Sequence, residues 1–141
     1  MSDPAFRDAF NLLCGALIGQ GTYRKVFECA IDPTLVVKVE LEQEWRTFPN
    51  HDEFRFWQEQ ADYRKVSDWL APCVRISPDA RILLQKRCQP LRATDTLPEK
   101  LPEFLTDRKR DNFGWYEGRL VCLDYQFTIY NSPLRPKKVT W

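Results

Sequence analysis

Residues 15–39 read GALIGQGTYRKVFECAIDPTLVVKV, and this stretch decides the fold. The alternating pattern over residues 23–30 predicts a strand, and the β-branched run at 35–39 predicts a second strand that is too apolar for an exposed edge. Asp32-Pro33 predicts the turn between these two strands. The glycines at positions 19 and 21 predict a hairpin turn before the first of them. The segment therefore predicts neighbouring strands joined by tight turns.

Two helices are predicted, one on either side of this segment. Residues 2–14 begin with a capping residue and a proline and then repeat apolar residues at helical spacing, so we expect a helix that ends at Gly15. Residues 51–70 carry apolar residues on helical faces and contain no glycine or proline. They predict one long helix, which Pro72 closes.

The second half of the chain is predicted to add short strands. Residues 73–76 and 81–85 are apolar segments on either side of a turn of Ser, Pro, Asp and Ala. Residues 113–124 predict two further strands around Glu117-Gly118. In the proline-containing stretch between these pairs, residues 99–105 predict one brief helix.

Composition indicates a single globular domain. The chain has 141 residues, of which 43% are hydrophobic and 13% aromatic, enough to build a core. We expect one domain over residues 1–130, followed by a basic, proline-containing tail over residues 131–141. Twenty-one Lys and Arg against twenty Asp and Glu leave a net charge of +1, which gives no support for a nucleic-acid or membrane-surface binder.

The cysteines and the histidine argue against several classes of site. Five cysteines without a CxxC pair favour reduced, mostly buried thiols in a cytoplasmic protein over a disulfide framework or a zinc site. His51 is the only histidine and G-x-S-x-G is absent, which argues against hydrolase triads and most catalytic zinc sites. Apolar runs stay far below the ~20 residues of a membrane span, and the N-terminus lacks a signal-peptide pattern.

Two segments of the first half carry candidate chemistry. Glycines at 19 and 21 would let the backbone pass close to phosphates, although a plain hairpin turn accounts for them equally well. Lys38 lies among apolar neighbours, where a buried amine needs an anion. Glu53 follows fifteen residues later and can supply that charge. The alternative is a lysine that extends to solvent from an edge strand, with Glu53 on a solvated helix face.

A third segment lies near the end of the chain. Asp107-Arg108-Lys109-Arg110-Asp111-Asn112 is followed by an apolar strand and then by Asp124. A carboxylate at the start of such a loop can orient a hydroxyl or a water molecule. An amide five residues later and a carboxylate after the strand can share Mg²⁺, which prefers oxygen ligands. A charged surface loop followed by a strand that ends in an aspartate turn is the alternative.

Taken together, these segments resemble the protein kinases and their small bacterial and phage-type relatives over residues 15–127. The matching motifs are Gly19-x-Gly21-x-x-Arg24-x-Val26, Leu35-Val36-Val37-Lys38, Glu53, Asp107-x-Lys109-x-x-Asn112 and Asp124-Tyr125-Gln126. The resemblance implies an α+β fold: a kinase-like N-lobe, built from a twisted antiparallel sheet and one long helix, with a much reduced C-lobe. It also implies ATP and Mg²⁺ as cofactors.

The resemblance assigns a role to each matching position. The nucleotide would contact Gly19, Gly21, Val26, Lys38 with its partner Glu53, and the hinge residues Lys86 and Cys88. Asp107 would be the catalytic base, with Lys109 near the transferred phosphate, and the metal ligands would be Asn112 and Asp124.

The chain also departs from the family pattern. Arg24 replaces the third glycine of the loop, Leu105-Thr106 stands where the family has His-Arg, and Tyr125-Gln126 replaces Phe-Gly. Only fifteen residues follow Gln126, which leaves no room for an activation segment or for the large helical half that binds protein substrates.

Two functions therefore stay open. The first is a minimal ATP-dependent phosphotransferase, because the motif positions carry the right residue types. The second is an inactive kinase-fold module, a pseudokinase from a phage or mobile element, that acts by binding a protein partner. Measuring the effect of ATP with Mg²⁺ on the melting temperature separates them, because ligand that binds the native state raises it.

The small second half also predicts a partner surface. Phe113, Trp115, Tyr116 and Tyr125 would be short of cover, and exposed apolar area of this kind indicates a homodimer or a docked protein. Residues 127–130 would add a strand or lie across this face, and the tail would reach the neighbour with Trp141 as an anchor. A disordered tail on a monomer is the alternative. A basic run beside aromatic residues imitates a single-strand nucleic-acid binder, but the flanking aspartates repel phosphate.

Overall fold

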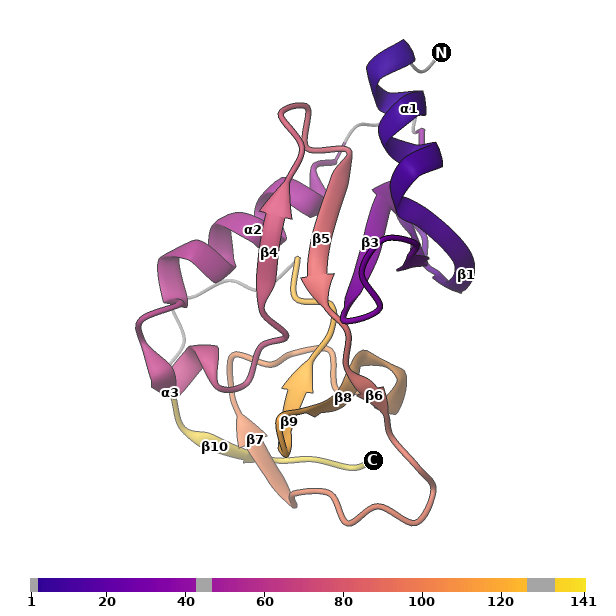
Figure 1. Ribbon diagram of the computed structural model, residues 1–141. Helices are drawn as coiled ribbons and strands as arrows, with labels where there is room; N and C mark the ends of the chain where they lie inside the picture. Colours follow the sequence, from indigo (N-terminus) through magenta and orange to yellow (C-terminus); the bar gives the residue numbers. More distant parts are fainter. Residues whose placement is uncertain (1–2, 43–46, 127–133) are drawn as a thin grey trace.

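The structure is a computed structural model in which residues 3–42, 47–126 and 134–141 are described. It is a mixed α+β fold whose sheets are antiparallel (Figure 1). A five-stranded sheet with two helices forms one part, and two small sheets form the other, with the C-terminus beside them (Figure 1). Among the described residues, no helix is long and apolar enough to cross a membrane.

The large sheet confirms the strands predicted from the opening segment. Its order is β1-β2-β3-β5-β4, with every neighbouring pair antiparallel. The strands are β1 (Cys14–Gln20), β2 (Arg24–Cys29), β3 (Leu35–Glu40), β4 (Cys73–Ile76) and β5 (Ile82–Lys86). β3 lies in the middle and is buried along its whole length, as its β-branched sequence predicts.

Helix α1 (Pro4–Leu13) closes one side of this sheet. The Asp3 carboxylate caps it by accepting a hydrogen bond from the Phe6 N–H at 2.8 Å. Its apolar face packs on the sheet, where the Phe10 and Phe27 rings meet edge to face at 5.3 Å. Gly15 does not end the helix as expected, because β1 already begins at Cys14 and Gly15 lies within the strand.

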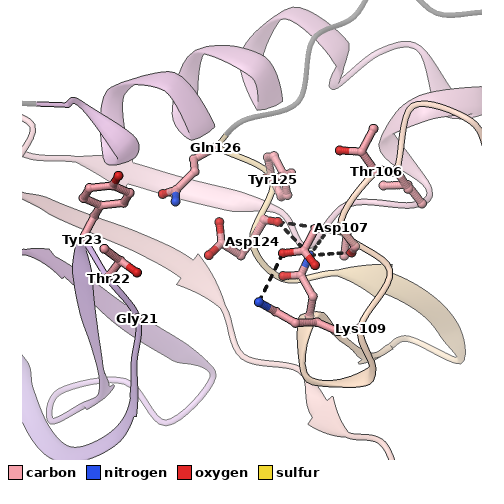
Figure 2. Close-up of a pocket in the computed structure, with 12 residues that line it drawn as sticks. Gly21, Thr22, Tyr23, Thr106, Asp107, Lys109, Asp124, Tyr125 and Gln126 are labelled. Carbon is pink, nitrogen blue, oxygen red and sulfur yellow. Dashed lines mark hydrogen bonds and ion pairs between the residues drawn. The ribbon is translucent and has the colours of Figure 1, made fainter. Parts of the chain in front are cut away.

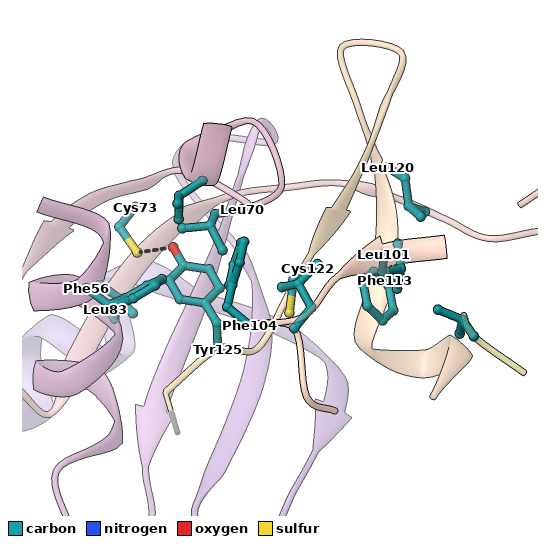
Figure 3. Packing of buried hydrophobic residues seen from close by; sticks show 13 residues of the cluster. Phe56, Leu70, Cys73, Leu83, Leu101, Phe104, Phe113, Leu120, Cys122 and Tyr125 are labelled. Atoms are coloured by element: carbon teal, nitrogen blue, oxygen red, sulfur yellow. Dashed lines mark hydrogen bonds between the residues drawn. The ribbon is translucent and has the colours of Figure 1, made fainter. Parts of the chain in front are cut away.

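The long helix expected over residues 51–70 is wrong. The chain forms α2 (Pro49–Gln60), turns, and then forms the short α3 (Arg64–Ser67). In one straight helix Leu70 would lie about 21 Å from Phe56 along the axis. Instead both side chains pack in one cluster around Tyr125 (Figure 3), and the break between α2 and α3 brings them together.

The second part of the fold contains a three-stranded and a two-stranded sheet. The first has the order β6-β8-β9, from β6 (Gln89–Pro90), β8 (Phe113–Tyr116) and β9 (Arg119–Cys122). The predicted turn at Glu117-Gly118 is present, and both residues have positive φ, +49° and +78°. The 3₁₀ turn η1 (Arg110–Asn112) leads directly into β8.

The brief helix expected over residues 99–105 is also wrong. Its centre forms β7 (Lys100–Pro102), which pairs with β10 (Pro136–Lys138) from the C-terminal tail. The Trp141 ring packs edge to face on Phe113 at 5.2 Å, and its indole N–H donates to the Pro98 carbonyl at 2.8 Å. Trp141 is thus anchored within its own chain, while the strand expected over residues 127–130 lies outside the described residues.

The largest core joins the two parts of the fold. Tyr125 lies at its centre, buried among side chains that include Phe56, Leu70 and Phe104 (Figure 3). The Tyr125 hydroxyl donates to the Ala71 carbonyl at 2.7 Å. Because the backbone of Tyr125 directly follows Asp124, this packing also fixes the position of a candidate site residue.

Candidate functional site

A cavity of about 220 Å³ brings together three segments that are far apart in the sequence (Figure 2). One wall is the turn at residues 21–23, between β1 and β2. The opposite wall is the loop at 105–112, and residues 124–126 close the space between them. The cavity therefore joins Gly21 with four residues predicted for catalysis and metal binding, Asp107, Lys109, Asn112 and Asp124.

The glycine turn is a tight hairpin with its own hydrogen bonds. The Gly21 N–H donates to the Arg24 carbonyl at 2.9 Å, and Gly19 lies opposite Val26 in the β1–β2 register. Gly19 and Val26 do not line the cavity with Gly21. A methyl group on Gly21 would meet no atom within 4 Å, so open space lies beside the turn.

The expected Lys38–Glu53 pair is present at the back of the site. Lys38 points from β3 toward α2, and its Nζ lies 2.5 Å from Glu53 Oε1. The same ammonium donates to the carbonyl of Leu123. Lys38 is only 4% exposed and Glu53 is fully buried, so this ion pair is shielded from solvent. Lys38 itself does not line the cavity.

Arg24 adds a second cation to this pair. Its guanidinium donates to both oxygens of Glu53, at 3.3 and 3.1 Å, and to the Asn50 side-chain oxygen at 3.1 Å. Its Nη2 also lies 2.9 Å from Asp124 Oδ1. Arg24 is 4% exposed, so one buried guanidinium links β2, α2 and the segment after β9.

Glu53 is the most heavily contacted side chain of the site. Besides the two cations, it accepts hydrogen bonds from the Tyr125 N–H at 2.8 Å and from the Gln85 amide at 3.3 Å. Burial alone would raise the pKa of Glu53, but the charges of Arg24 and Lys38 outweigh it and lower the pKa to about 2. Burial likewise opposes the charge of Arg24, and Glu53 and Asp124 reverse this effect, so the pKa of Arg24 is raised.

Asn112 fixes the loop of Asp107 and Lys109 against the end of β9. Its side-chain N–H groups donate to the Asp107 carbonyl at 3.0 Å and to the Asp124 carbonyl at 3.1 Å. The backbone adds a bond from the Leu123 N–H to the Asn112 carbonyl at 2.8 Å. Asn112 is buried, so its hydrogen bonds hold Asp107 and Asp124 at the same cavity.

Asp107 and Lys109 lie at the mouth of the cavity. Their side chains are largely exposed, and Lys109 Nζ lies 3.5 Å from Asp107 Oδ2 (Figure 2). An exposed carboxylate of this kind can accept a proton from a hydroxyl group that approaches from solvent. The neighbouring ammonium can attract a phosphate group to the same place.

The oxygen donors of the cavity fit Mg²⁺ in kind. Asp124 and Asp107 supply carboxylates and Asn112 supplies an amide, and Mg²⁺ completes such a set with water and phosphate oxygens. Within the described ranges, no group of three or more His, Cys, Asp or Glu residues could hold a metal ion by itself. A metal here would therefore depend on oxygens from a ligand, and Asp124 already carries an ion pair with Arg24.

The two predicted hinge residues are not part of this cavity. Lys86 and Cys88 line a second hollow of about 460 Å³, beside Thr34 and Tyr116. The Lys86 N–H donates to the Pro72 carbonyl and the Arg87 N–H to the Thr34 carbonyl, both at 2.8 Å, so internal contacts use both donors. Burial raises the pKa of Cys88 to about 11.

Arg24 and Asn50 complete the site in a way that the sequence does not indicate. In the sequence Arg24 stands out only as a departure from a glycine pattern, and Asn50 belongs to no motif. Asn50 is fully buried and donates to the Lys38 carbonyl at 3.1 Å, which holds α2 against β3. A charged residue directly after a glycine turn is the available signal, but its acidic partners lie 29 and 100 residues away.

A scan against protein-family models and a search of curated proteins each found no match to this chain.

Proposed function

We propose that the chain is a minimal protein-kinase-like domain that binds ATP with Mg²⁺ and transfers a phosphoryl group. The observation that carries this proposal is the single cavity shared by the glycine turn, the residue 105–112 loop and Asp124 (Figure 2). The resemblance to kinases requires these three segments, which would bind phosphate and metal, to lie together, and all three line the cavity.

The arrangement of elements supports the kinase-like assignment. The five-stranded antiparallel sheet, with α2 packed against β3, β4 and β5, would be the N-lobe expected from the resemblance. The two small sheets would be the much reduced C-lobe. The buried Lys38–Glu53 ion pair between β3 and α2 supports the same assignment. The five free cysteines agree with a cytoplasmic location.

Each cavity residue has a defined task in this proposal. Asp107 would accept the proton of the acceptor hydroxyl, and Lys109 would contact the transferred phosphate. Asn112 and Asp124 would hold Mg²⁺, which neutralises charge on the phosphates when bound. A volume of about 220 Å³ is smaller than a typical ligand pocket, so it suits the phosphate end of the nucleotide, with the nucleoside extending outside.

The inactive module is the second candidate, and the internal contacts of the charged side chains favour it. Asp124 Oδ1 is already paired with Arg24, and the Lys38 ammonium is occupied by Glu53 and the Leu123 carbonyl. A site whose charged groups are satisfied internally has less charge available for a nucleotide and a metal. In this case the domain would act by binding a protein partner or a second copy of itself.

Calorimetric titration with ATP, with and without Mg²⁺, followed by an assay for ADP release, distinguishes the candidates. The phosphotransferase is expected to bind ATP more tightly with Mg²⁺ and to release ADP. Asp124→Asn should remove the Mg²⁺ dependence, whereas Asp107→Asn should keep binding and lose ADP release. Asp111→Asn, an exposed change in the same loop, is the control. ATP binding without ADP release supports the inactive module, and absence of ATP binding contradicts the proposed function.

A further inference from the structure

The Arg24–Asp124 ion pair occupies the carboxylate to which a metal would bind. Asp124 lines the cavity with its side chain 48% exposed, yet its Oδ1 lies 2.9 Å from the buried guanidinium of Arg24. We propose that Arg24 is a built-in counter-ion that keeps a free divalent cation off Asp124, so that metal binds only together with a polyphosphate. This inference rests on the proposed function and defines how its metal ion is admitted.

Electrostatic repulsion by Arg24 is the first reason to expect that a free divalent cation does not bind Asp124. Arg24 and Lys38 provide two buried positive charges, which Glu53 and Asp124 balance one for one. A divalent cation placed on Asp124 would lie next to a guanidinium that shares the same carboxylate, and like charges at such a separation repel strongly in a partly buried site. A free metal ion therefore competes with Arg24 and meets its repulsion.

The location of Arg24 is the reason to expect that a polyphosphate would admit the metal. It directly follows Tyr23, a residue of the cavity wall, and its backbone carbonyl closes the glycine turn by accepting from the Gly21 N–H at 2.9 Å. Phosphates bound beneath that turn would lie close to Arg24 and offer its guanidinium another anion. The metal would then meet a carboxylate released from Arg24 and phosphate oxygens at the same time.

The remaining contacts allow Arg24 to be replaced without leaving Glu53 unpaired. Without Arg24, Glu53 still accepts from Lys38, from the Gln85 amide and from the Tyr125 N–H. Arg24→Gln should therefore fold while leaving Asp124 without its cation. Arg24→Lys keeps a charge but loses the fork that spans two carboxylates, so it should free Asp124 in part.

The test is a calorimetric titration with MnCl₂ alone, then with MnCl₂ and a non-hydrolysable ATP analogue. The wild type should bind Mn²⁺ alone weakly and bind it tightly with the analogue. Arg24→Gln should bind Mn²⁺ alone at least about tenfold more tightly, because a neighbouring charge has been removed. Arg87→Gln, which changes an exposed arginine paired with Glu28 outside the cavity, should behave like the wild type.

The outcomes separate this inference from the proposed function. If the wild type binds the analogue with metal but folded Arg24→Gln gains no affinity for Mn²⁺ alone, the inference is wrong and the proposed function stands. If the wild type does not bind the analogue while Arg24→Gln binds Mn²⁺, Arg24 guards Asp124 but the nucleotide function is wrong. Binding in neither protein contradicts both. Should Arg24→Gln not fold, Arg24→Lys decides: a gain of less than about threefold overturns the inference.

Discussion

Glu53 is the carboxylate that both buried cations of the site depend on. It is fully buried and pairs with both Arg24 and Lys38, which are themselves buried cations. Glu53→Gln should therefore lower the free energy of unfolding by about 3–5 kcal/mol, because it leaves buried positive charge uncompensated. Urea denaturation measures this loss. Glu59→Gln, on the exposed side of α2, removes only a surface pair with Arg55 and should cost less than about 0.5 kcal/mol.

The same carboxylate predicts a pH dependence. The pKa of Glu53 is about 2 in the folded protein and about 4.5 in its ordinary state, so its folded value is depressed. Its contribution to stability is then fully present above pH 4.5 and is lost as the pH falls toward 2. We expect the stability difference between wild type and Glu53→Gln to shrink by about 3 kcal/mol over this range. A difference that stays constant between pH 5 and pH 2 would contradict the charge assignment.

At the residue scale, the sequence predicts the Lys38–Glu53 ion pair but not the contacts of Arg24 and Asn112. Lys38 and Glu53 could be paired in advance because an amine in an apolar strand needs an anion, and α2 supplied one nearby. Arg24 could not be placed in the same way, because Asp124 reaches it only after the whole chain has folded. Asn112 was expected as a metal ligand, yet its side-chain N–H groups also bind two backbone carbonyls, which no sequence pattern indicates.

Among the elements, β8 packs closely against β6, directly after the loop that carries Asp107 and Asn112. A methyl group on Gly114 of β8 would lie 2.9 Å from the Gln89 carbonyl oxygen and 3.1 Å from the Cys88 Cβ. Gly114→Ala should therefore cost about 1–3 kcal/mol, since the strands must separate to admit it. Thermal unfolding gives the change in stability.

Gly21→Ala serves as the matched control for this prediction. The added methyl group meets nothing within 4 Å, and the backbone at Gly21 does not have positive φ. Its stability should be unchanged or slightly raised, because alanine restricts the unfolded chain. If Gly21→Ala destabilises as much as Gly114→Ala, the packing explanation for Gly114 is wrong.

Local sequence patterns predicted some elements correctly. They failed where contacts with a distant segment of the chain determine the structure. The run at residues 35–39 and the turn at Glu117-Gly118 carry their own signals, a β-branched strand and a glycine suited to positive φ. Residues 100–102 look helical locally but pair with a strand 36 positions later. The helix over residues 51–70 breaks because Phe56 and Leu70 must reach the same core.

For the whole molecule, the C-terminal residues contribute to the fold of their own chain. Trp141 packs on Phe113 and donates to the Pro98 carbonyl, while Val139 is buried. Trp141→Ala should lower stability by about 2 kcal/mol, less than for a fully buried tryptophan. Urea denaturation measures the loss, and Lys137→Ala on exposed β10 is the control.

Light scattering of the same two variants tests the expected partner surface. Because Trp141 is used internally, we expect its removal to change stability without changing the molecular mass in solution. A dimer that dissociates in Trp141→Ala would show instead that this residue also joins two copies. If Trp141→Ala is as stable as the wild type, the C-terminal tryptophan does not hold the fold together.

Paramagnetic NMR locates the proposed nucleotide–metal site most directly. Bound Mn²⁺ broadens the amide signals of nearby residues, so titrating MnCl₂ with ATP maps where the metal lies. We expect broadening of Gly21–Tyr23, the residue 107–112 loop and Asp124–Gln126 together, since all three segments line one cavity. We expect little broadening by MnCl₂ without ATP. Broadening confined to other residues, or none when both ligands are present, would contradict a nucleotide–metal site between these segments.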